Sequence, residues 1–246
     1  MNDLTVKCIE WIRDYFNENG GKNAVVGISG GKDSTVVVAL CTEALGKECV
    51  AGVMMPNGEQ KDIRDSERVC DLLGIKSCKL NINSMYKSTL WQLKNNAGFE
   101  PTPQTEINIA PRLRMTMLYA FAQSLPSARV ANTSNFDEGL VGYATLWGDS
   151  VGDFAPLKNL HVSQVIEMGL DLGLPEDLVK KAPSDGLTGK TDEEALGFSY
   201  VDVESMYLKY TDYNRNFTEQ ERKAFERMEM MRWKRSMVCG IPSFEP

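Results

Sequence analysis

The segment at residues 26–35, VGISGGKDST, combines residue types that can hold a phosphate group. Gly30 and Gly31 carry no side chains, so their backbone N–H groups can approach an anion closely. Lys32 adds a full positive charge, and a helix that begins here adds partial positive charge at its N-terminus. The other candidate phosphate contacts in the segment are Gly27, Ser29 and Ser34. Together these residues predict a turn that binds a polyphosphate.

A carboxylate sets this turn apart from the common nucleotide-binding loop, which has four residues between its first glycine and Gly-Lys-Ser/Thr. Here the interval from Gly27 to Gly31 is one residue too short, and Asp33 stands where a hydroxyl residue should follow Lys32. Asp33 would repel a polyphosphate unless a divalent cation stood between them. We therefore expect Mg²⁺ as a cofactor, bound in a magnesium–nucleotide complex. The plainer alternative is a strand–turn–helix corner without a ligand.

Short apolar runs alternate with helical segments around this turn. The first run precedes the turn directly, and the third shows the alternation of a strand near the edge of a sheet. This order predicts parallel strands with right-handed crossovers, so we expect an α/β fold with a doubly wound, mainly parallel sheet flanked by helices. The predicted strands are residues 23–28, 49–55, 76–82 and 128–134. Because ligands bind at the carboxyl ends of such strands, the turn is well placed.

The remaining segments are predicted from periodicity and from residues that begin or end helices. Pro111 suits the first turn of a helix over 107–125, and Thr191 and Glu194 have the spacing of a capping box. Residues 136–156 are rich in glycine and acids and predict a long functional loop with about one helical turn. A charged helix over 218–235 is expected to close the fold. The other predicted helices are residues 4–16, 35–45, 62–73, 159–174 and 175–182.

The composition describes an ordinary soluble globular protein, with 246 residues, 42% of them hydrophobic and 25% charged. No linker or repeat interrupts residues 1–246, so we predict a single domain.

The net charge of -7 disfavours nucleic acid as a partner, and no apolar run approaches the ~20 residues that cross a membrane. The six cysteines form no Cys-x-x-Cys pair, which favours reduced thiols in a cytoplasmic protein. His161 is the only histidine, which disfavours a histidine triad or a zinc site.

The complete SGGKDS sequence resembles the pyrophosphate loop of the N-type ATP pyrophosphatases, whose fold is adenine nucleotide alpha-hydrolase-like and Rossmann-like. Those enzymes cleave ATP between its α and β phosphates. Further stretches, in the same order over nearly the whole chain, resemble the ammonia-dependent NAD synthetases. They are MPNGEQKDIRDS (55–66), NIAPRLRM (108–115), NTSNFDE (132–138), GYATLWGDSVGDFAPL (142–157) and KAPSDGLTGKTDEEALGFSYVDVE (181–204). Each stretch is weak evidence alone, but five in order are strong evidence.

The resemblance implies roles for residues outside the phosphate turn. Glu138 takes the position of a second metal ligand beside Asp33, and Lys32, Asp33 and Glu138 take the positions of catalytic residues. The plainer alternative for Glu138 is an ordinary acid of the loop. The implied ATP contacts are Met54, Gln60, Thr133 and Ser184, and the implied substrate contacts are Arg112, Asp153 and Lys234. Plainer alternatives stay open for three of them. Met54 could belong to the core, Arg112 could lie on an exposed helix face, and Asp153 could cap a turn.

The reaction that the resemblance implies is the ammonia-dependent synthesis of NAD⁺. The carboxylate of nicotinic acid adenine dinucleotide attacks the α-phosphate of MgATP, pyrophosphate leaves, and ammonia then displaces AMP from the acyl-adenylate. The chain is too short to include the amidase (glutaminase) domain of glutamine-dependent relatives, so we expect free ammonia as the nitrogen donor. The resemblance also implies a homodimer, with the helix of Arg112 near the contact region.

Three positions depart from the family pattern. Leu146 stands where a substrate-side lysine is often found, Val162 stands where a lysine near the ATP phosphates is found, and Trp233 replaces a histidine. These changes leave the phosphate turn and both proposed metal ligands intact, so they bear on the acceptor more than on the reaction type. Lys158 or Lys190 could supply a missing charge.

Two rival functions remain open at this point. One is another ATP-pyrophosphatase-type amide ligase or a thiolation enzyme with a different acceptor, although the acidic charge and unpaired cysteines disfavour thiolation. The other is a non-catalytic nucleotide-binding homologue that has lost its acceptor site. The intact pair Asp33 and Glu138 opposes this second rival, because a sensor does not need both metal ligands.

Overall fold

The structure, a computed structural model, describes residues 1–60, 63–181, 191–238 and 240–246. A parallel sheet at its centre has the strand order β3-β2-β1-β4. The strands are β1 (Asn23–Gly27), β2 (Val50–Met54), β3 (Lys76–Lys79) and β4 (Ala128–Val130). The predicted parallel sheet is therefore confirmed, and the third strand lies at an edge as its alternation predicted. The chain order reverses between β1 and β4, and this reversal forms a crevice at their carboxyl ends.

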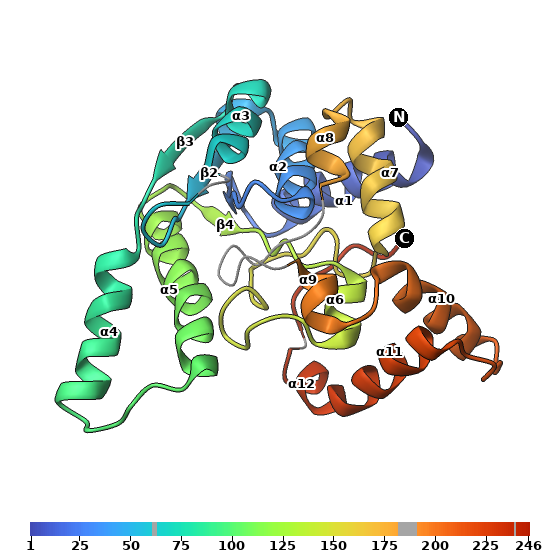
Figure 1. The fold of residues 1–246 in the computed structure, drawn as a ribbon. Coiled ribbons are helices and arrows are strands. Elements are labelled where there is room, and N and C mark those ends of the chain that lie inside the picture. The colour runs from blue at the N-terminus through green and yellow to red at the C-terminus, as the bar shows by residue number, and fades with distance from the viewer. Residues whose placement is uncertain (61–62, 182–190, 239) are drawn as a thin grey trace.

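The two faces of the sheet are covered by different helices (Figure 1). In β1, Ala24 and Val26 pack with α1 (Asp3–Glu18), α2 (Lys32–Leu45) and α7 (Val162–Asp171). Val25 points to the opposite face, where it packs with Leu118 and Ala122 of α5 (Pro103–Gln123). This alternation follows from the two-residue period of a strand. Each fully buried valine contributes about 1.5–3 kcal/mol, so the strand before the phosphate turn is firmly anchored.

Helix α2 begins directly after the phosphate turn, with Gly31 as its N-cap, and ends at Gly46, whose φ is 82°. Its side chains are buried almost without interruption from Ser34 to Cys41. The helix lies between α1, α7 and the sheet, which explains why it is apolar on all sides. The turn is thus held between a buried strand and a buried helix. The same face also carries η1 (Lys47–Cys49), α3 (Ile63–Leu73) and α8 (Glu176–Val179).

The C-terminal helices form a second hydrophobic cluster below the sheet (Figure 1). The helices that contribute to it are α6 (Phe136–Val141), α9 (Asp192–Leu196), α10 (Tyr200–Thr211) and α11 (Glu219–Met230), and α12 (Arg232–Met237) follows α11. The prediction of one helix over 218–235 is wrong, because the backbone leaves the helix at Met231 and α12 begins at the next residue. Met231 packs closely against Gly142, where an added Cβ would lie 2.8 Å from its side chain. This contact fixes the bend beside α6.

Helices α4 (Asn83–Asn95) and α5 extend together away from the sheet (Figure 1). The prediction that Pro111 lies in the first turn of its helix is wrong, because α5 begins at Pro103, with Thr102 as its N-cap. A proline inside a helix removes one backbone hydrogen bond but does not prevent the helix when the rest packs well. Within the described residues, no helix is long and apolar enough to pass through a membrane.

Candidate active site

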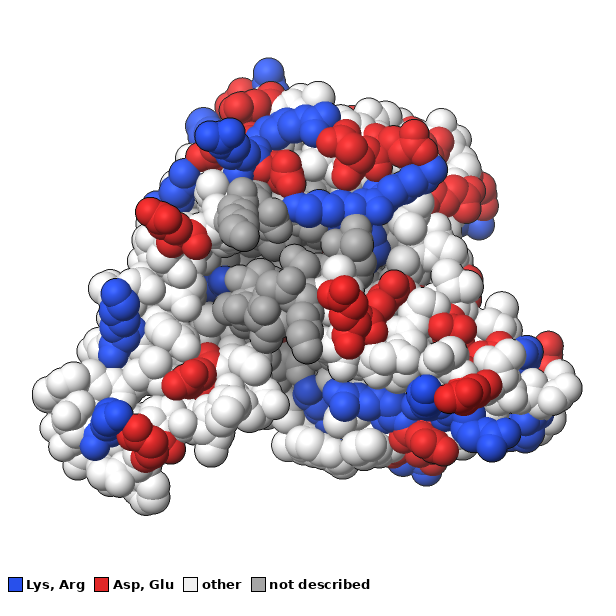
Figure 2. Space-filling model, in the orientation of Figure 1, with Lys and Arg blue, Asp and Glu red and all other residues white. Residues whose placement is uncertain are grey.

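A cavity of about 1090 Å³ opens at the carboxyl ends of β1 and β4. Residues from distant parts of the chain line it, from Gly27 after β1 to Lys234 in α12. This position matches the crevice that the reversal in strand order creates. On the face shown in Figure 2, acidic and basic side chains are interspersed over much of the surface, and basic side chains form a band over the C-terminal helices at the lower right.

The phosphate turn is held open by contacts within itself. Gly30 has a φ of 81°, a left-handed conformation that glycine adopts without strain. The hydroxyls of Ser29 and Ser34 lie 3.0 Å apart, and Ser29 Oγ accepts a hydrogen bond of 3.2 Å from the Gly31 backbone N–H. Ser34 Oγ donates to the Gly31 carbonyl at 3.2 Å. These contacts fix the curve of the backbone around the start of α2, where an anion would meet the helix N-terminus.

Lys32 and Asp33 form a pair at the wall of the cavity. Lys32 Nζ donates to Asp33 Oδ2 at 2.8 Å, although the lysine is only 2% exposed. Asn135 Nδ2 donates to the other oxygen of Asp33 at 3.0 Å. Burial alone lowers the pKa of Lys32, but Asp33 and Glu138 outweigh it and raise the pKa above its ordinary value. The lysine is therefore held in its charged form.

Glu138 lies in the first turn of α6, on the far side of the same charge cluster. Its Oε2 accepts from the Asn135 backbone at 3.2 Å, and Asn135 Oδ1 accepts from the Glu138 backbone at 3.0 Å, which completes a capping box. Burial raises the pKa of Glu138 well above its ordinary range, and Asp33 raises it further, whereas Lys32 opposes the shift. Two acids that disfavour each other's charge, in a cavity of oxygen ligands, fit a hard divalent cation such as Mg²⁺.

The neighbour of Glu138 ties α6 to α7. Asp137 is fully buried, and its carboxylate accepts from the Val162 backbone at 2.8 Å and contacts His161 Nδ1 at 2.7 Å. The hydrogen bond to the Asp137 carboxylate raises the pKa of His161. Ligand atoms of Asp137, His161 and Glu204 lie within 4.8 Å of one another. Because both oxygens of Asp137 already have partners, we interpret this group as a structural support for the turn that carries Glu138.

The opposite end of the cavity is lined by cations that bind backbone carbonyls. Arg112 Nε, from α5, donates to the Leu146 carbonyl at 3.1 Å. Lys234 Nζ, from α12, donates to the Gly142 carbonyl at 2.7 Å. Burial lowers the pKa of Lys234. Both side chains line the cavity, so a carboxylate or phosphate of an acceptor could replace these carbonyl contacts.

The loop between these two ends is fixed to β4. Asn132, which follows β4, donates from Nδ2 to the carbonyls of Asp149 at 2.9 Å and Val151 at 3.1 Å. Gly152 packs so closely that an added Cβ would lie 2.7 Å from the Asn132 backbone nitrogen. A larger residue at 152 would therefore push the loop away from the sheet. The predicted long loop includes α6, which is slightly more than the single helical turn expected.

Most of the predicted site residues meet in the cavity. Those that line it are Gly27, Ser29, Gly31, Lys32, Asp33, Ser34, Gln60, Arg112, Thr133, Glu138 and Lys234. Gly30 shapes the turn without lining the cavity. Ser184, and with it Lys190, lies outside the described residues. The roles in binding stay predictions.

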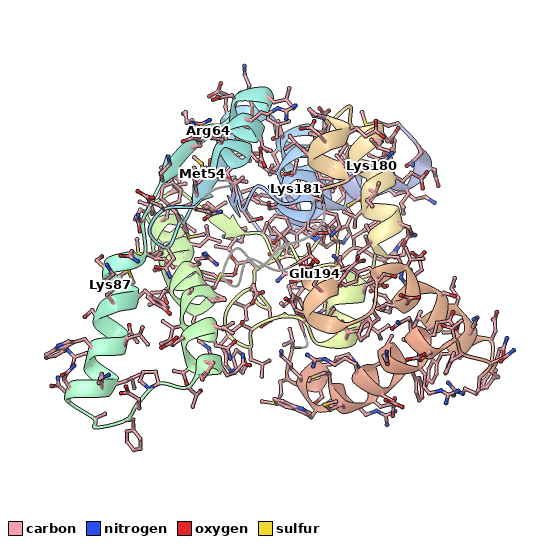
Figure 3. The ribbon with its side chains drawn as sticks, in the orientation of Figure 1. Met54, Arg64, Lys87, Lys180, Lys181 and Glu194 are labelled. Atoms are coloured by element: carbon pink, nitrogen blue, oxygen red, sulfur yellow. The ribbon has the colours of Figure 1, made fainter. Side chains whose placement is uncertain are left out.

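Two predicted residues have other surroundings. The side chain of Met54 belongs to the core at the end of β2, while its neighbour Met55 lines the cavity (Figure 3). Asp153 does not line the cavity; its carboxylate accepts from Tyr119 Oη at 3.1 Å and from the Val130 backbone at 2.8 Å. The geometry favours the core alternative for Met54. The contacts of the Asp153 carboxylate join α5 to β4 and do not cap a turn, so its role in substrate binding stays a prediction.

Several residues of the site were not predicted from the sequence. Asn135 is one of them, and its place five residues after the end of β4, in capping-box spacing with Glu138, was a usable signal. Asp192 also lines the cavity, and Tyr200 packs beside Lys32 with its ring centre 5.7 Å from the Nζ atom. No local pattern reveals these two, because only the tertiary fold brings them to the phosphate turn.

The departures from the family pattern are visible in the structure. Leu146 and Trp233 line the cavity at the end that holds Arg112. Val162 packs against the C-terminal cluster at the start of α7. The cavity therefore has no side-chain cation at positions 146 and 233, whereas Val162 does not line it.

Fold and site define an α/β nucleotide-binding enzyme, in which a phosphate turn and acids from separate elements share one cavity. The model of the NAD synthase family matches residues 4–238. The chain therefore belongs to the NAD synthase family. The resemblance to the ammonia-dependent NAD synthetases is confirmed, and with it the expectation of an ATP-dependent carbon–nitrogen ligase.

Individual relatives agree with this family. The NH(3)-dependent NAD(+) synthetase of Pyrococcus horikoshii is 45% identical over 207 residues, which cover 84% of this chain and 79% of that protein. The solved NMN synthetase of Francisella tularensis matches 95% of this chain and 94% of its own at 29% identity, with a TM-score of 0.83. The solved NH3-dependent NAD synthetase of Campylobacter jejuni covers both chains completely at 26% identity, with a TM-score of 0.78. These structures confirm the Rossmann-like fold.

Proposed function

We propose that this protein is an ammonia-dependent NAD synthetase that joins ammonia to the nicotinate carboxylate of nicotinic acid adenine dinucleotide, with ATP as co-substrate and AMP and pyrophosphate as products. The observation that carries the proposal is the meeting of Asp33 and Asn135, 102 residues apart, across the phosphate turn. That contact brings Glu138 and the turn into one cavity. This arrangement fits a nucleotide-binding site better than a strand–turn–helix corner without a ligand.

The phosphate turn is proposed to hold the pyrophosphate that leaves. The start of α2, with Ser29 and Ser34, lines the cavity and offers backbone amides and hydroxyls. Lys32 also lines it, and its amine stays protonated and positively charged. These donors stabilise negative charge as it forms on the departing phosphates. Thr133, after β4, and Gln60, whose Nε2 lies 3.5 Å from the Ser29 carbonyl, are placed to contact the rest of ATP.

Asp33 and Glu138 are proposed to hold Mg²⁺. Both are carboxylates that line the cavity, and each disfavours the charge of the other, so a divalent cation would relieve their repulsion. When bound, Mg²⁺ supplies charge neutralisation at the phosphates. Asn135 orients Asp33, and the capping box orients Glu138, so both acids are positioned before the nucleotide arrives.

Arg112 and Lys234 are proposed to bind the acceptor and bring its carboxylate in line with the α-phosphate. Their contacts with the carbonyls of Leu146 and Gly142 place two cations at one end of the cavity. No described side chain is needed as a nucleophile, because the acceptor carboxylate attacks first and ammonia attacks the activated carbonyl afterwards. Closure by residues 183–190, an expectation from the family resemblance, falls outside the described residues.

A smaller acceptor is a specific alternative. The Francisella tularensis relative is an NMN synthetase, and this chain has Leu146 where a substrate-side lysine is often found. Both observations concern the acceptor end of the cavity, so nicotinic acid mononucleotide is the second candidate acceptor. The adenylation and amidation steps would be the same.

We also propose that residues 1–246 act as one catalytic domain and as a homodimer in the cytoplasm. One cavity is lined from residue 27 to residue 234, which argues for one domain. A shallow pocket of about 220 Å³ beside Arg112 includes the exposed Trp147, a surface suited to a second copy. The described cysteines are free thiols, as suits a reducing compartment.

One assay tests the function. The protein is incubated with MgATP, ammonium and either the dinucleotide or the mononucleotide acceptor, and NAD⁺, NMN, AMP and pyrophosphate are measured. NAD⁺ with equal AMP supports the proposal, and faster formation of NMN assigns the smaller acceptor. Release of ADP in place of AMP would refute the cleavage between the α and β phosphates.

A further inference from the structure

A buried group from the C-terminal helices lies beside the phosphate turn. Asp192, the first residue of α9, is 5% exposed and lines the cavity with Lys32. Tyr200, at the start of α10, is 3% exposed, and its hydroxyl donates to Asp192 Oδ2 at 3.4 Å. The Tyr200 ring lies 5.7 Å from Lys32 Nζ. Thus α9 and α10 both bring a buried side chain close to the lysine.

Lys32 shares the cavity with three carboxylates, those of Asp33, Glu138 and Asp192. Each of the three favours the charged form of the lysine. A divalent cation is suited to the same group of acids. Burial raises the pKa of Tyr200, and the same three carboxylates raise it further, so the hydroxyl stays a hydrogen-bond donor.

Lys32 donates a hydrogen bond to Asp33 at 2.8 Å. Asp33 is also a proposed ligand of Mg²⁺, so the lysine and the metal would share one carboxylate. An ammonium group and a divalent cation repel each other at one carboxylate, so Lys32 needs a different counter-ion when the metal site is filled. Asp192 is buried, lines the same cavity and comes from α9, which carries no proposed metal ligand.

We propose that Asp192 is a positioning residue, which becomes the counter-ion of Lys32 once Asp33 faces a divalent cation. This inference rests on the proposed function, because only a metal-bound nucleotide requires Lys32 to leave Asp33. Tyr200 holds the Asp192 carboxylate through its hydroxyl and covers the lysine with its ring, where a cation is favoured. The capping box of Thr191 and Glu194 fixes the turn of α9 that carries Asp192.

The test is the Mn²⁺ affinity of the full-length protein in complex with α,β-methylene-ATP, measured by electron paramagnetic resonance, in Asp192→Asn. We expect the affinity to fall about tenfold, because Lys32 then stays at Asp33 and competes with the metal. The kcat for AMP formation should fall by a similar factor while the KM of the acceptor is unchanged. Asp192→Glu should recover part of the affinity, which a purely structural role does not predict.

The matched control is Glu194→Gln, which removes a neighbouring charge of α9 (Figure 3) while glutamine keeps the capping box. It should retain the wild-type affinity for Mn²⁺. Tyr200→Phe keeps the ring over Lys32 but loses the hydroxyl, and should show a smaller loss in the same direction. This variant also serves if Asp192→Asn does not fold.

An Mn²⁺ affinity and a kcat within about twofold of wild type in Asp192→Asn would overturn the proposal. An equal loss in Glu194→Gln would also overturn it, since the effect would then be one of general charge. If the wild type forms neither AMP nor NAD⁺, the proposed function fails, while the Mn²⁺ comparison still tests Asp192.

Discussion

The two ends of the cavity are built in different ways. At the phosphate end, consecutive residues of the turn bind one another, and Asp33 receives contacts from Lys32 and Asn135. At the acceptor end, Arg112 and Lys234 come from α5 and α12 and bind only carbonyls among the contacts that the structure gives them. The phosphate end is therefore pre-organised by side chains. The acceptor end is held by backbone contacts that a ligand can exchange, so it can vary between relatives without loss of the chemistry.

The largest expected effect belongs to the phosphate end. Asp33→Asn removes the charge of a proposed metal ligand that also pairs with Lys32, and we expect kcat for AMP formation to fall about a thousandfold. The melting temperature and the circular dichroism spectrum should stay close to wild type, because asparagine keeps the shape of the side chain. Turnover at the wild-type rate would remove Asp33 from the metal site and abolish the contrast between the two ends.

The next effect concerns the stability of α10 and α11, which precede the helix that carries Lys234. Burial raises the pKa of Glu221, but contacts with Lys209, Ser205 and the Thr218 backbone outweigh it and lower the pKa from 4.5 to about 2. Lys209 is 31% exposed, so solvent weakens the pair. We expect Glu221→Gln to destabilise the protein by about 2 kcal/mol at pH 7.

The sign follows from the lowered pKa. The folded state keeps Glu221 ionised, so its stabilisation is complete above the unfolded pKa of 4.5 and is lost as the pH falls toward about 2. Urea unfolding of wild type and Glu221→Gln should therefore differ at pH 7 and converge at low pH. A difference that stays constant down to the lowest pH would show that the charge of Glu221 does not support these helices.

At the acceptor end, Arg112→Ala should raise the KM of the acceptor about thirtyfold and change the KM of ATP far less. The arginine lies across the cavity from the turn and contacts the Leu146 carbonyl, so its loss should spare the phosphates. Steady-state kinetics with each substrate varied in turn give the two constants, and Arg112→Lys serves as a charge-preserving control. An equal rise in both constants would contradict the separation of the two ends.

The sequence predicted the phosphate end better than the acceptor end for physical reasons. The turn is contiguous, and the buried β-branched strand before it is a strong local signal. Met54 shows the limit of that signal, because side chains alternate along a strand and a shift of one residue turns Met55, not Met54, toward the cavity. Asp192 and Tyr200 were missed because only long-range packing brings them to Lys32.

The missed helix α4 has a different explanation. None of its side chains is buried, so it presents no apolar stripe to a core and gives little periodic signal. The bend at Met231 and the interior position of Pro111 are also tertiary effects, because neighbouring elements decide where each helix can continue. The family resemblance gave Glu138 its role, since the surrounding loop has no pattern that distinguishes one acid from another.

The smallest expected effect belongs to a substitution that restores the lysine of the family pattern at the acceptor end. Leu146 lines the cavity, and its carbonyl holds Arg112, so Leu146→Lys places a second cation beside the arginine without changing the backbone contact. We expect the KM of the dinucleotide acceptor to fall about fivefold, equivalent to roughly 1 kcal/mol of added ion pairing. The KM of ATP should not change, because the phosphate turn lies at the other end. Leu146→Met, which has a similar length but no charge, separates the effect of charge from that of shape. An equal fall of the acceptor KM in Leu146→Met would show that the charge of a lysine at position 146 is not what improves acceptor binding. A parallel change in the KM of ATP would show that the two ends of the cavity are coupled.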